Sequence, residues 1–550
     1  MLMKIRFRIL SPCVARAVAV LSTAVFVAGA PSSTWAAGVV GTGTAASCSD
    51  AALDAALAGG GLVTFDCGGP ATIDISTGTG TKMIAVDTTI DGGGLITISG
   101  GDAVGLFSVN SGVAFTVENL TIANGHIGDG NGGGIANHNG SLTVANSTFT
   151  GNSVGVCAFG CTGSGGGIDN EGGTLTVTNS TFAGNSAGAG GGLSNVGGST
   201  VTVTNSTFSD NSGHEDGGGI SIGGGTLTVT DSTFTSNIAG DGGGINKLGG
   251  TLTVTNSTFS GNRAFAGGGI FNAGLGAGET LTVTNSTFSG NSGDGGPQGA
   301  GGGICNVGTL AVTDSTFTGN SAGAGGGLSN AGGRIVTVAN STFSDNSGGA
   351  GAGIFNDDRY GTSTVTNTIL AGSASGGNCS HVTDGGHNLD SGTSCGFSAA
   401  NASLSNTDPQ LDPAGLQDNG GPTQTVALCT AVGAPVGCTA ASPAIGAGDQ
   451  TVCAAAPVND RDQRGFVRPS VGHTQCSIGA YEADAVPPAP CIGDCDADGM
   501  VAINELVLGV NMALDLQPVT ACPAFQNAQA MVDIAQLVTG VKNALNGCGA

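Results

Sequence analysis

Two short motifs that repeat in alternation constrain the fold of this chain more than any other feature of its sequence. The segment Gly249–Asn262 reads GGTLTVTNSTFSGN, and GGTLTVTNSTFAGN runs from Gly172 to Asn185. Looser copies place a Phe three residues before an Asn, at Phe149, Phe208, Phe234, Phe288, Phe317 and Phe343. Between the copies stands GGGI or GGGL, ending at Ile135, Ile168, Leu193, Ile220, Ile245, Ile270, Ile304 and Leu328, with GAGI at Ile354. A period of mostly about 24 to 29 residues indicates one supersecondary unit stacked on itself.

Within each copy, apolar residues alternate with threonine, which predicts a strand with one buried face. Phe259 lies an odd number of residues after Val254, so the chain must bend near Asn256 and Ser257 to bring the ring inward. Because every copy runs in the same direction, equivalent strands are expected to lie parallel, about 4.8 Å apart. The sequence therefore predicts an all-β fold, a parallel β-helix of about ten or more coils, right-handed because parallel crossovers nearly always are.

Asparagine recurs at the predicted bend, at Asn146, Asn179, Asn205, Asn256, Asn285 and Asn340. We expect these side chains to stack as a hydrogen-bonded ladder. Each also begins an N-x-T acceptor sequence for glycosylation. The repeat requires this residue with or without a sugar, so the ladder is the favoured interpretation.

The paired motifs GG[AG][IL] and FxxN resemble the repeat of bacterial polymorphic outer-membrane proteins, within the pectin-lyase-like superfamily of right-handed β-helix proteins. The resemblance covers roughly residues 119–370. It implies the fold and leaves the activity open, because this scaffold carries lyases, hydrolases and adhesins alike.

Residues 1–36 are typical of a signal peptide. Lys4, Arg6, Arg8 and Arg16 precede or border an apolar run over residues 17–30, and residues 34–36 fit a cleavage site. No later apolar run approaches the length that spans a membrane. We therefore expect a secreted chain, extracellular or at the bacterial cell surface or outer membrane, without a transmembrane segment.

The charge of the mature chain excludes one class of partner. Removing residues 1–36 takes away four of the 13 basic residues and none of the 38 acidic ones, which leaves a formal net charge of −29. Nucleic acid is therefore not expected as a partner, and acidic polysaccharide would be repelled unless calcium bridged the two.

Export permits disulfides, and neighbouring cysteines suggest the pairs. They are Cys48–Cys67, Cys157–Cys161, Cys379–Cys395, Cys429–Cys438 and Cys453–Cys476, with Cys491, Cys495, Cys522 and Cys548 pairing among themselves. Cys305 is left over and is expected to be a packed thiol; a reactive or intermolecular cysteine is the alternative.

Residues 37–118 are expected to form an N-terminal cap and the first coils. Asp50 is the predicted N-cap of a short helix that Gly59–Gly61 ends. The glycine-cornered strands that follow are less regular than later copies, as terminal repeats usually are.

One pair of carboxylates in the repeats invites a catalytic interpretation. Asp216 and Asp241 both precede GGG, one coil apart, with His214 and Glu215 beside the first. Stacked carboxylates shift their pKa values or recruit a cation, as an acid–base or calcium site of a lyase or glycosidase requires. Solvated corner residues are the favoured interpretation, because the mature chain has no Trp and only two Tyr, and its basic residues fall at unrelated repeat positions.

From residue 371 the repeat dissolves into terminal coils and another domain, ending at residue 484. His381 and His387 flank Asp384 between Cys379 and Cys395, either as a metal site or, the favoured interpretation, as a disulfide-closed loop. The segments DNGGPTQTVAL, SPAIGAGD, DQRGFVRP and CSIGAYE then follow in order between Asp418 and Glu482. They resemble the choice-of-anchor domain that follows β-helices in many secreted bacterial proteins, which implies attachment and no catalysis.

A proline-rich linker, residues 485–490, leads to a predicted calcium module at residues 491–550. The segment from Asp494 to Glu505 fits D-x-D-x-D-G-x5-E. Its expected ligands are the carboxylates of Asp494, Asp496 and Asp498, the Met500 carbonyl and both oxygens of Glu505.

Two apolar patterns of helical spacing, 31 residues apart, make this module a duplicated loop–helix unit. They are Ile503, Leu506, Val507, Val510 and Leu514, and then Ile534, Leu537, Val538, Val541 and Leu545. The unit resembles a dockerin-like tandem EF-hand module, but its second loop, near Gln526–Gln536, lacks the carboxylates. We therefore expect one Ca²⁺, and the departure weakens the implied binding of a cohesin-like partner.

The sequence thus favours a secreted or cell-surface structural or adhesive β-helix protein, attached through a calcium-binding C-terminal module to a cohesin-like or other surface partner. Catalytic residues are not predicted. The alternatives are an extracellular polysaccharide-active enzyme and an adhesin or virulence-type protein with a glycan or other cell-surface ligand.

Overall fold

A computed structural model describes the chain from Gly38 onward, with gaps. The described residues are 38–157, 161–274, 276, 278–295, 300–332, 335–359, 361–373, 375–487, 492–495, 501, 503–514, 517–518, 522–526 and 531–546. The predicted signal peptide, residues 1–36, lies outside them, as do residues 488–490 of the predicted linker.

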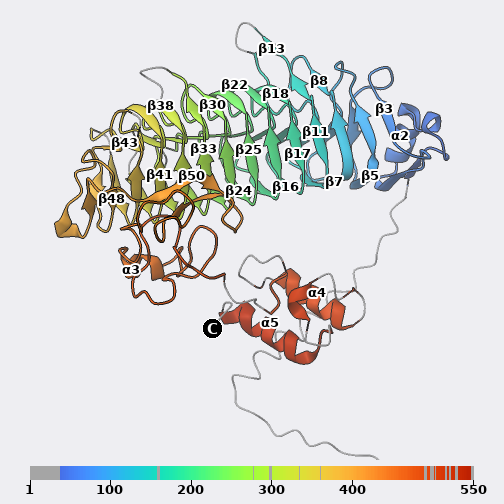
Figure 1. Ribbon diagram of the computed structural model, residues 1–550. Coiled ribbons are helices and arrows are strands. Elements are labelled where there is room, and N and C mark those ends of the chain that lie inside the picture. Colours follow the sequence, from blue (N-terminus) through green and yellow to red (C-terminus); the bar gives the residue numbers. More distant parts are fainter. Residues whose placement is uncertain are drawn as a thin grey trace, which may run out of the picture.

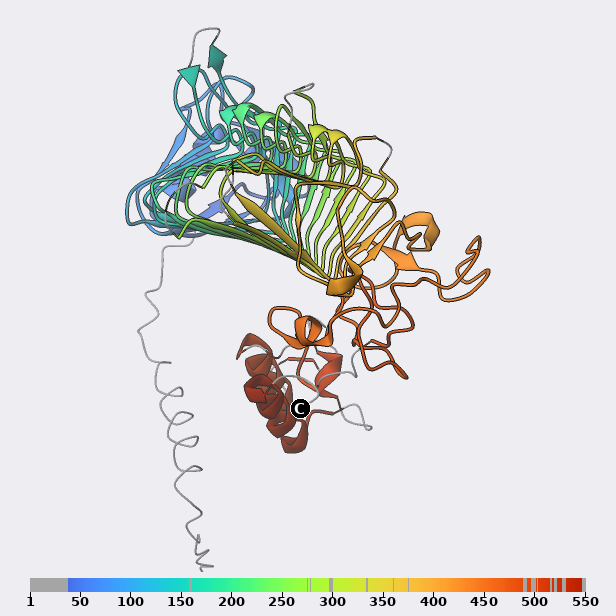
Figure 2. The same ribbon diagram turned by 90° about the vertical axis from the view of Figure 1, so that its left-hand side faces the viewer.

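The chain is a right-handed parallel β-helix of about 13 turns, which confirms the predicted fold class. Figures 1 and 2 show its coils stacked along one axis, from the blue N-terminal end to the orange coils. Within the described residues, parallel sheets of 26, 12 and 9 strands run the length of the stack.

Each regular coil contributes four strands. The first in each coil are β10 (Ser141–Ala145), β16 (Thr174–Thr178), β20 (Thr200–Thr204), β24 (Thr226–Thr230), β28 (Thr251–Thr255), β32 (Thr280–Thr284), β36 (Thr309–Thr313), β40 (Ile335–Ala339) and β44 (Thr362–Thr366). The second are β11 (Thr148–Thr150), β17 (Thr181–Ala183), β21 (Thr207–Ser209), β25 (Thr233–Thr235), β29 (Thr258–Ser260), β33 (Thr287–Ser289), β37 (Thr316–Thr318), β41 (Thr342–Ser344) and β45 (Ile369–Ala371).

The other two strands of each coil form the smaller sheets. One set is β12 (Ser153–Val154), β18 (Ser186–Ala189), β22 (Ser212–Asp216), β26 (Ile238–Asp241), β30 (Arg263–Ala264), β34 (Ser292–Gly293), β38 (Ser321–Ala324) and β42 (Ser347–Ala350). The set that follows GGG is β9 (Ile135–His138), β15 (Ile168–Glu171), β19 (Leu193–Val196), β23 (Ile220–Ile222), β27 (Ile245–Lys247), β31 (Ile270–Asn272), β35 (Ile304–Asn306), β39 (Leu328–Asn330) and β43 (Ile354–Asn356).

The phenylalanines of the repeat form one continuous stack inside the β-helix. From Phe149 to Phe343, neighbouring ring centroids lie 4.5–4.9 Å apart and the planes tilt by 1–7°. Asn256, at φ +50°, provides the predicted bend that returns Phe259 to the interior. The odd spacing between Val254 and Phe259 is therefore explained by one left-handed residue at the corner.

The GGG motif exists because of this stack. A Cβ on Gly244, the third glycine, would lie 2.6 Å from the Gly269 carbonyl oxygen and 2.9 Å from Cδ1 of Phe259. Gly242, the first, has φ +66° at the corner, where a side chain is disfavoured. The glycines of GGG and the Phe of the other motif are therefore required by the same packing of one coil on the next.

A ladder of buried asparagines runs beside the rings, built from the Asn of FxxN. Asn237 donates from Nδ2 to Asn262 Oδ1 and to the Phe208 carbonyl, both at 2.9 Å. Its Oδ1 accepts from the backbone N–H and from Nδ2 of Asn211, at 3.0 and 2.9 Å. The same pattern links Asn152, Asn185, Asn211, Asn237, Asn262, Asn291, Asn320 and Asn346. Each interior amide is therefore fully satisfied.

The ladder predicted at the bend is only partly present. Nδ2 of Asn179 donates to Asn146, and Nδ2 of Asn205 donates to Asn179. In later coils Asp231 and Asp314 replace the asparagine, and Oδ1 of Asn256 and Nδ2 of Asn340 have no hydrogen-bond partner. A carboxylate cannot donate, so each Asp interrupts the donor–acceptor alternation; the continuous ladder forms three residues after the Phe instead.

The N-terminal end is closed by helix α2 (Asp50–Leu57) and by irregular first coils. The predicted N-cap, Asp50, is wrong by one residue, because Ser49 accepts the N–H of Ala52. Asp50 instead pairs with the buried ammonium of Lys82, which also contacts Asp54. The strands here are β1 (Gly38–Val40), β2 (Gly61–Phe65), β3 (Ala71–Asp74), β4 (Lys82–Ile84), β5 (Thr88–Ser99), β6 (Phe107–Val109), β7 (Ala114–Ala123) and β8 (His126–Ile127).

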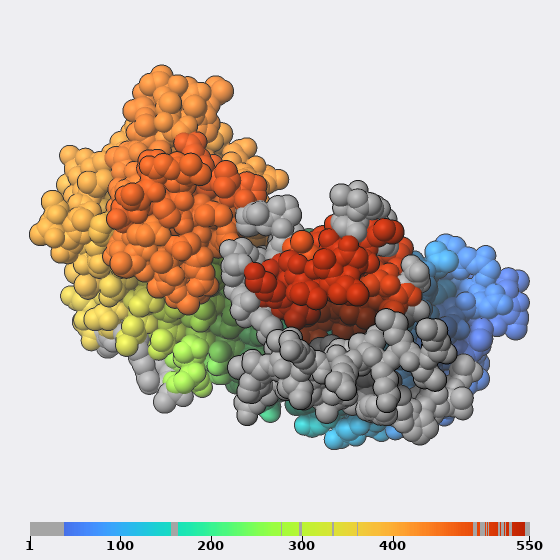
Figure 3. Space-filling model, turned by 90° about the horizontal axis from the view of Figure 1, so that it is seen from below, coloured from blue at the N-terminus to red at the C-terminus, as the bar shows by residue number. Residues whose placement is uncertain are grey.

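After β45 the coils shorten and the chain turns back along the outside of the β-helix. Short strands β46 (Cys379–Ser380), β47 (Thr383–Asp384), β48 (Leu389–Asp390) and β49 (Leu404–Ser405) end the stack, and β50 (Leu411–Gln417) pairs with β51 (Thr425–Leu428). Helix α3 (Gln450–Ala454) follows. Figure 3 shows this orange segment lying over the yellow and yellow-green coils.

Gln463 joins the returning segment to the threonine face of the coils. Its Nε2 donates to Thr287 Oγ1 at 2.8 Å, and its Oε1 accepts from Thr316 Oγ1 at 2.6 Å. The Ala480 N–H donates to Thr342 Oγ1 at 3.1 Å. These three threonines are buried, whereas their counterparts on the preceding coils are partly exposed.

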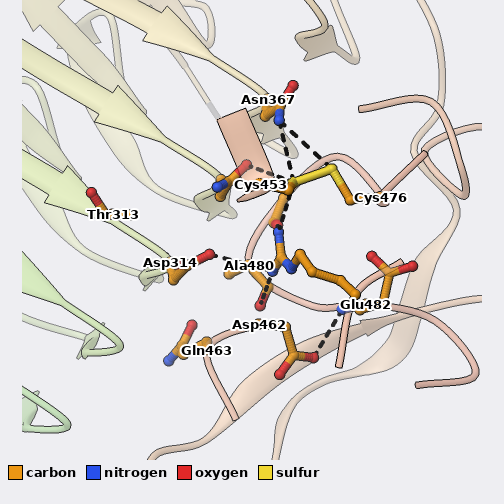
Figure 4. Close-up of polar contacts among 12 residues, drawn as sticks. Thr313, Asp314, Asn367, Cys453, Asp462, Gln463, Cys476, Ala480 and Glu482 are labelled. Carbon is orange, nitrogen blue, oxygen red and sulfur yellow. Dashed lines mark hydrogen bonds and ion pairs between the residues drawn. A yellow bond between two sulfur atoms is a disulfide. The ribbon is translucent and has the colours of Figure 1, made fainter. Parts of the chain in front are cut away.

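A buried ion pair reinforces the same contact (Figure 4). Nη2 of Arg468 lies 3.3 Å from Oδ1 of Asp314, and both side chains are buried. The guanidinium also donates to the carbonyls of Gly479 and Ala480. Burial raises the pKa of Asp314 to about 7, while Arg468 opposes part of that rise.

Five disulfides are formed among the described residues. Cys48–Cys67, Cys379–Cys395, Cys429–Cys438 and Cys453–Cys476 confirm four predicted pairs. Cys495–Cys522 accords with pairing among the last four cysteines, of which Cys491 and Cys548 lie outside the described residues. The side chains of Cys157 and Cys161, at the hairpin β13 (Val156–Cys157) and β14 (Cys161–Thr162), also lie outside them. Cys305 is a free, buried thiol.

Replacing Gly244 by Ala should lower the melting temperature by several degrees, because the new Cβ must displace either the adjacent carbonyl or the phenylalanine stack. Gly224→Ala is the matched control: its nearest neighbour would be 3.9 Å away and its φ is not left-handed. Thermal unfolding followed by circular dichroism checks both. Equal melting temperatures for the two variants would refute the coupling of GGG to the rings.

Replacing Arg468 by Met should loosen the returning segment, since one partner of a buried ion pair is then left alone, a change that costs about 3–5 kcal/mol. The folded pKa of Asp314 lies above its ordinary value, so ionisation opposes folding as the pH rises from about 4 through 7. The loss of thermal stability in Arg468→Met should therefore be larger at pH 8 than at pH 5. Asp314→Asn added to Arg468→Met should restore most of it, and a pH-independent loss would contradict this account.

Candidate functional site

The carboxylates of Asp216 and Asp241 lie on neighbouring strands, as predicted. They are register partners in β22 and β26, directly before the glycine corner. Both are half-buried, while His214 and Glu215 are exposed. Nδ2 of Asn246 donates to Oδ1 of Asp216 at 2.5 Å, which ties the first carboxylate to the following coil.

The electrostatics of this pair are those of crowded carboxylates. Burial raises the pKa of Asp216, and the nearby charges of Asp241 and Glu215 raise it further. Burial also raises the pKa of Asp241. Within the described part of the chain, no group of three or more His, Cys, Asp or Glu side chains is placed to hold a metal ion. The pKa values of both carboxyls thus lie above the ordinary value, and the stack offers at most two acidic ligands.

Asp169, the second residue after a GGG motif, is a buried acidic residue that the sequence analysis does not predict as a site residue. Its side chain is fully buried, and neither carboxyl oxygen has a hydrogen-bond partner. Burial raises the pKa of Asp169 to about 7. Ser194 lowers this pKa in part, and the charge of Glu171 adds to the rise. His138 Nδ1 contacts Glu171 Oε2 at 3.0 Å nearby. The available signal was an acidic residue at a position that holds Ala136, Ser194 or Ser221 in neighbouring coils.

The loop between Cys379 and Cys395 is organised around Asp384. Its Oδ1 accepts from Gly386 N–H, Asn388 Nδ2 and Ser403 Oγ. Its Oδ2 accepts from Ser398 N–H and Asn401 Nδ2. Both oxygens of this carboxylate therefore already accept two or more hydrogen bonds from the protein. His387 Nδ1 contacts the Ala447 carbonyl oxygen at 2.9 Å. These contacts favour the disulfide-closed loop over a metal site here.

A cavity of about 210 Å³ lies beside the first coils. It is lined by residues 64–69, 91–93, Leu95 and Ile96. The Asp91 carboxylate on its wall accepts from Gly93 N–H and Asn119 Nδ2. Asp91 therefore has a structural role in holding the widened corner of β5.

The predicted calcium loop is described only at its two ends. Asp496, Asp498 and Met500 lie outside the described residues, whereas Asp494 and Glu505 lie within them. Glu505 is 4% exposed, and its Oε1 accepts the Cys495 N–H at 2.5 Å. The last predicted ligand thus contacts the residue next to the first, and the Ca²⁺ site itself remains a prediction.

The helices that follow have the predicted spacing, but they leave most of the apolar pattern uncovered. They are α4 (Ile503–Ala513) and α5 (Ile534–Asn546). Both pack around Phe525, whose ring lies close to Gly509 and Gly540. The exposed positions are Ile503 (81%), Val507 (54%), Val510 (44%), Leu514 (62%), Ile534 (78%), Val538 (62%) and Val541 (40%). Leu506 and Leu537 are the partly buried members of the pattern.

Comparison with known proteins supports the fold and identifies no activity. Residues 160–309 match the family described as right handed beta helix region. No curated protein and no solved structure matched the chain. In the described part of the chain, none of the helices has both the length and the apolar character needed to cross a membrane.

Replacing both Asp216 and Asp241 by Asn should raise the melting temperature at pH 8 by a few degrees and leave it nearly unchanged at pH 4. Both folded pKa values lie above the ordinary value, so the stability these groups contribute is lost as the pH rises above about 4. Asp129→Asn, at an exposed carboxylate, is the control. Lower stability of the double variant at pH 8 would contradict simple repulsion, and loss of a glycan-cleaving activity would establish the enzyme alternative.

Proposed function

We propose that this protein is a secreted or cell-surface β-helix protein with a structural or adhesive role, attached through a calcium-binding C-terminal module. The observation that carries the proposal is a regular row of exposed or partly exposed threonines along the outside of the coils. Thr176, Thr202, Thr228, Thr253 and Thr282 are register partners in one row. Rows at about 4.8 Å present the same hydroxyl and methyl groups many times to one ligand or surface.

Repetition favours adhesion over catalysis in physical terms. Weak contacts that recur along one rigid face add up through effective concentration. Catalysis instead requires several different groups converging on one reacting centre. Asp216 and Asp241 are two carboxylates of the same kind on neighbouring coils, and Oδ1 of Asp216 already accepts a hydrogen bond from Asn246.

We infer attachment through the C-terminal module for three reasons. The apolar residues of α4 and α5 are exposed to an extent that a monomeric helical unit seldom shows. The buried Glu505, which accepts a hydrogen bond from Cys495, fits a calcium loop that orders these helices. The resemblance of the loop–helix unit to dockerin-like modules and of residues 401–483 to choice-of-anchor domains points the same way.

An extracellular polysaccharide-active enzyme is the second candidate. It is favoured by the raised pKa values of Asp169, Asp216 and Asp241, which suit proton transfer. A glycan array on the mature protein, combined with product analysis, separates the two functions. Intact bound glycan supports adhesion, and shortened or unsaturated oligosaccharides support the enzyme.

Calcium should raise the melting temperature of the C-terminal module in the mature chain, because it binds the folded form preferentially. Titration calorimetry should give a stoichiometry near one. Glu505→Gln should remove most of the gain and should release the protein from the cell surface that retains it. Gln536→Ala, at the position of α5 that lies 31 residues after Glu505, is the matched control and should change little. A stoichiometry near two, or no response to calcium, would contradict the proposed site.

A further inference from the structure

Lys247 is a buried amine at a position that most other coils give to asparagine. The third residue of the strand after GGG is Asn170, Asn195, Asn272, Asn306 and Asn330 in other coils. In β27 this position is Lys247, whose side chain is 0% exposed. Its Nζ has no hydrogen-bond partner. An amine buried in this way costs several kcal/mol unless it is neutral or chemically altered.

Asn272 is the register partner of Lys247 on the next coil. Its Nδ2 donates to Asn306 Oδ1 at 2.6 Å and to the Thr309 carbonyl at 3.3 Å. Its Oδ1 has no hydrogen-bond partner. Side chains of register partners in a parallel pair leave the sheet on the same side. A carboxamide with fixed orientation and an amine therefore project together into the interior.

Gly274 brings the two groups and a carboxylate together. A Cβ at Gly274 would lie 2.4 Å from Nζ of Lys247 and 3.4 Å from Oε2 of Glu279. A Cβ at Gly308 would lie 2.4 Å from the Gly274 carbonyl oxygen and 3.1 Å from Nδ2 of Asn272. The absence of a side chain at Gly274 thus leaves the amine, the carboxamide and the carboxylate around one backbone unit.

We propose that Lys247 and Asn272 are joined by an isopeptide bond between neighbouring coils, formed with Glu279 as the proton-transferring group. No activity of the mature protein is needed for this modification, and it does not depend on the proposed function.

The reaction balances without any co-reactant. Glu279 takes a proton from the Lys247 ammonium, and the free Nζ attacks Cγ of Asn272. A proton moves from the attacking nitrogen to Nδ2 as the Cγ–Nδ2 bond breaks. Ammonia leaves and takes up the proton held by Glu279, so that the products are a secondary amide and an ammonium ion.

The surroundings favour this step. Burial lowers the pKa of Lys247, and the Glu279 carboxylate opposes part of the shift. A larger fraction of the amine is therefore neutral and nucleophilic than in water. The interior position also excludes the water that would compete for Cγ. The product converts an unpartnered amine into an amide N–H, which is cheaper to bury than a charge.

Mass spectrometry of the reduced, denatured mature protein tests the proposal. The bond removes one ammonia, so the mass should be about 17 Da below that of the sequence, and trypsin should not cleave after Lys247. Lys247→Met, Asn272→Ala and Glu279→Gln should each restore the full mass, corrected for the substitution. Asn272→Asp should instead lose about 18 Da as water.

Lys542→Met is the matched control, because Lys82, Lys247 and Lys542 are the three lysines of the mature chain. It should retain the 17 Da deficit. The proposal is overturned if the wild-type protein has its full mass with ordinary cleavage after Lys247. A deficit of about 18 Da located at Glu279 would also overturn it, since that product joins Lys247 to the carboxylate.

Discussion

The register of neighbouring coils, enforced by the buried asparagine ladder and the phenylalanine stack, is the constraint on which the rest of the structure depends. Each interior amide makes four hydrogen bonds that only a neighbour one coil away can supply. A one-residue slip would leave buried amides unsatisfied, which is costly in a low-dielectric interior. The glycine corners follow from the same constraint, because Gly244 and its counterparts must clear the rings.

This rigid core determines what the outside can do. The threonine rows inherit the register of the interior, so the outer face is regular without any contacts of its own. The returning segment uses that regularity: Gln463 bonds to threonines of two adjacent coils. Arg468 pairs with Asp314, one of the two aspartates that interrupt the asparagines of the bend. Thr287, Thr316 and Thr342 are thus covered by the chain itself, whereas their counterparts on the preceding coils are partly exposed.

Sequence periodicity was enough to predict the solenoid, because the two motifs record the packing of one coil on the next. The position of the ladder was not predictable to the same degree, since both Asn256 and Asn262 recur and only the structure distinguishes the corner from the interior. Asp169 and Lys247 stand at positions where other coils also have polar side chains, so the sequence does not show that these two charged groups are buried. Gln463 and Arg468 dock the returning segment through Thr316 and Asp314, which lie more than 140 residues earlier in the chain. The local motif around Gln463 and Arg468 does not indicate these partners. The five calcium ligands come from a local spacing, and all of them remain a prediction: Asp494, Asp496, Asp498, Met500 and Glu505.

Hydrogen exchange of the native mature protein, followed by mass spectrometry, tests most directly whether the interior ladder holds the β-helix together. We predict that the slowest-exchanging peptides cover the coils from Ser180 to Asn346, where ladder and stack are continuous. Peptides from the terminal coils near β46–β49 should exchange faster, because the phenylalanine stack does not extend to them. Equal or faster exchange in the central coils than in the terminal ones would contradict the account.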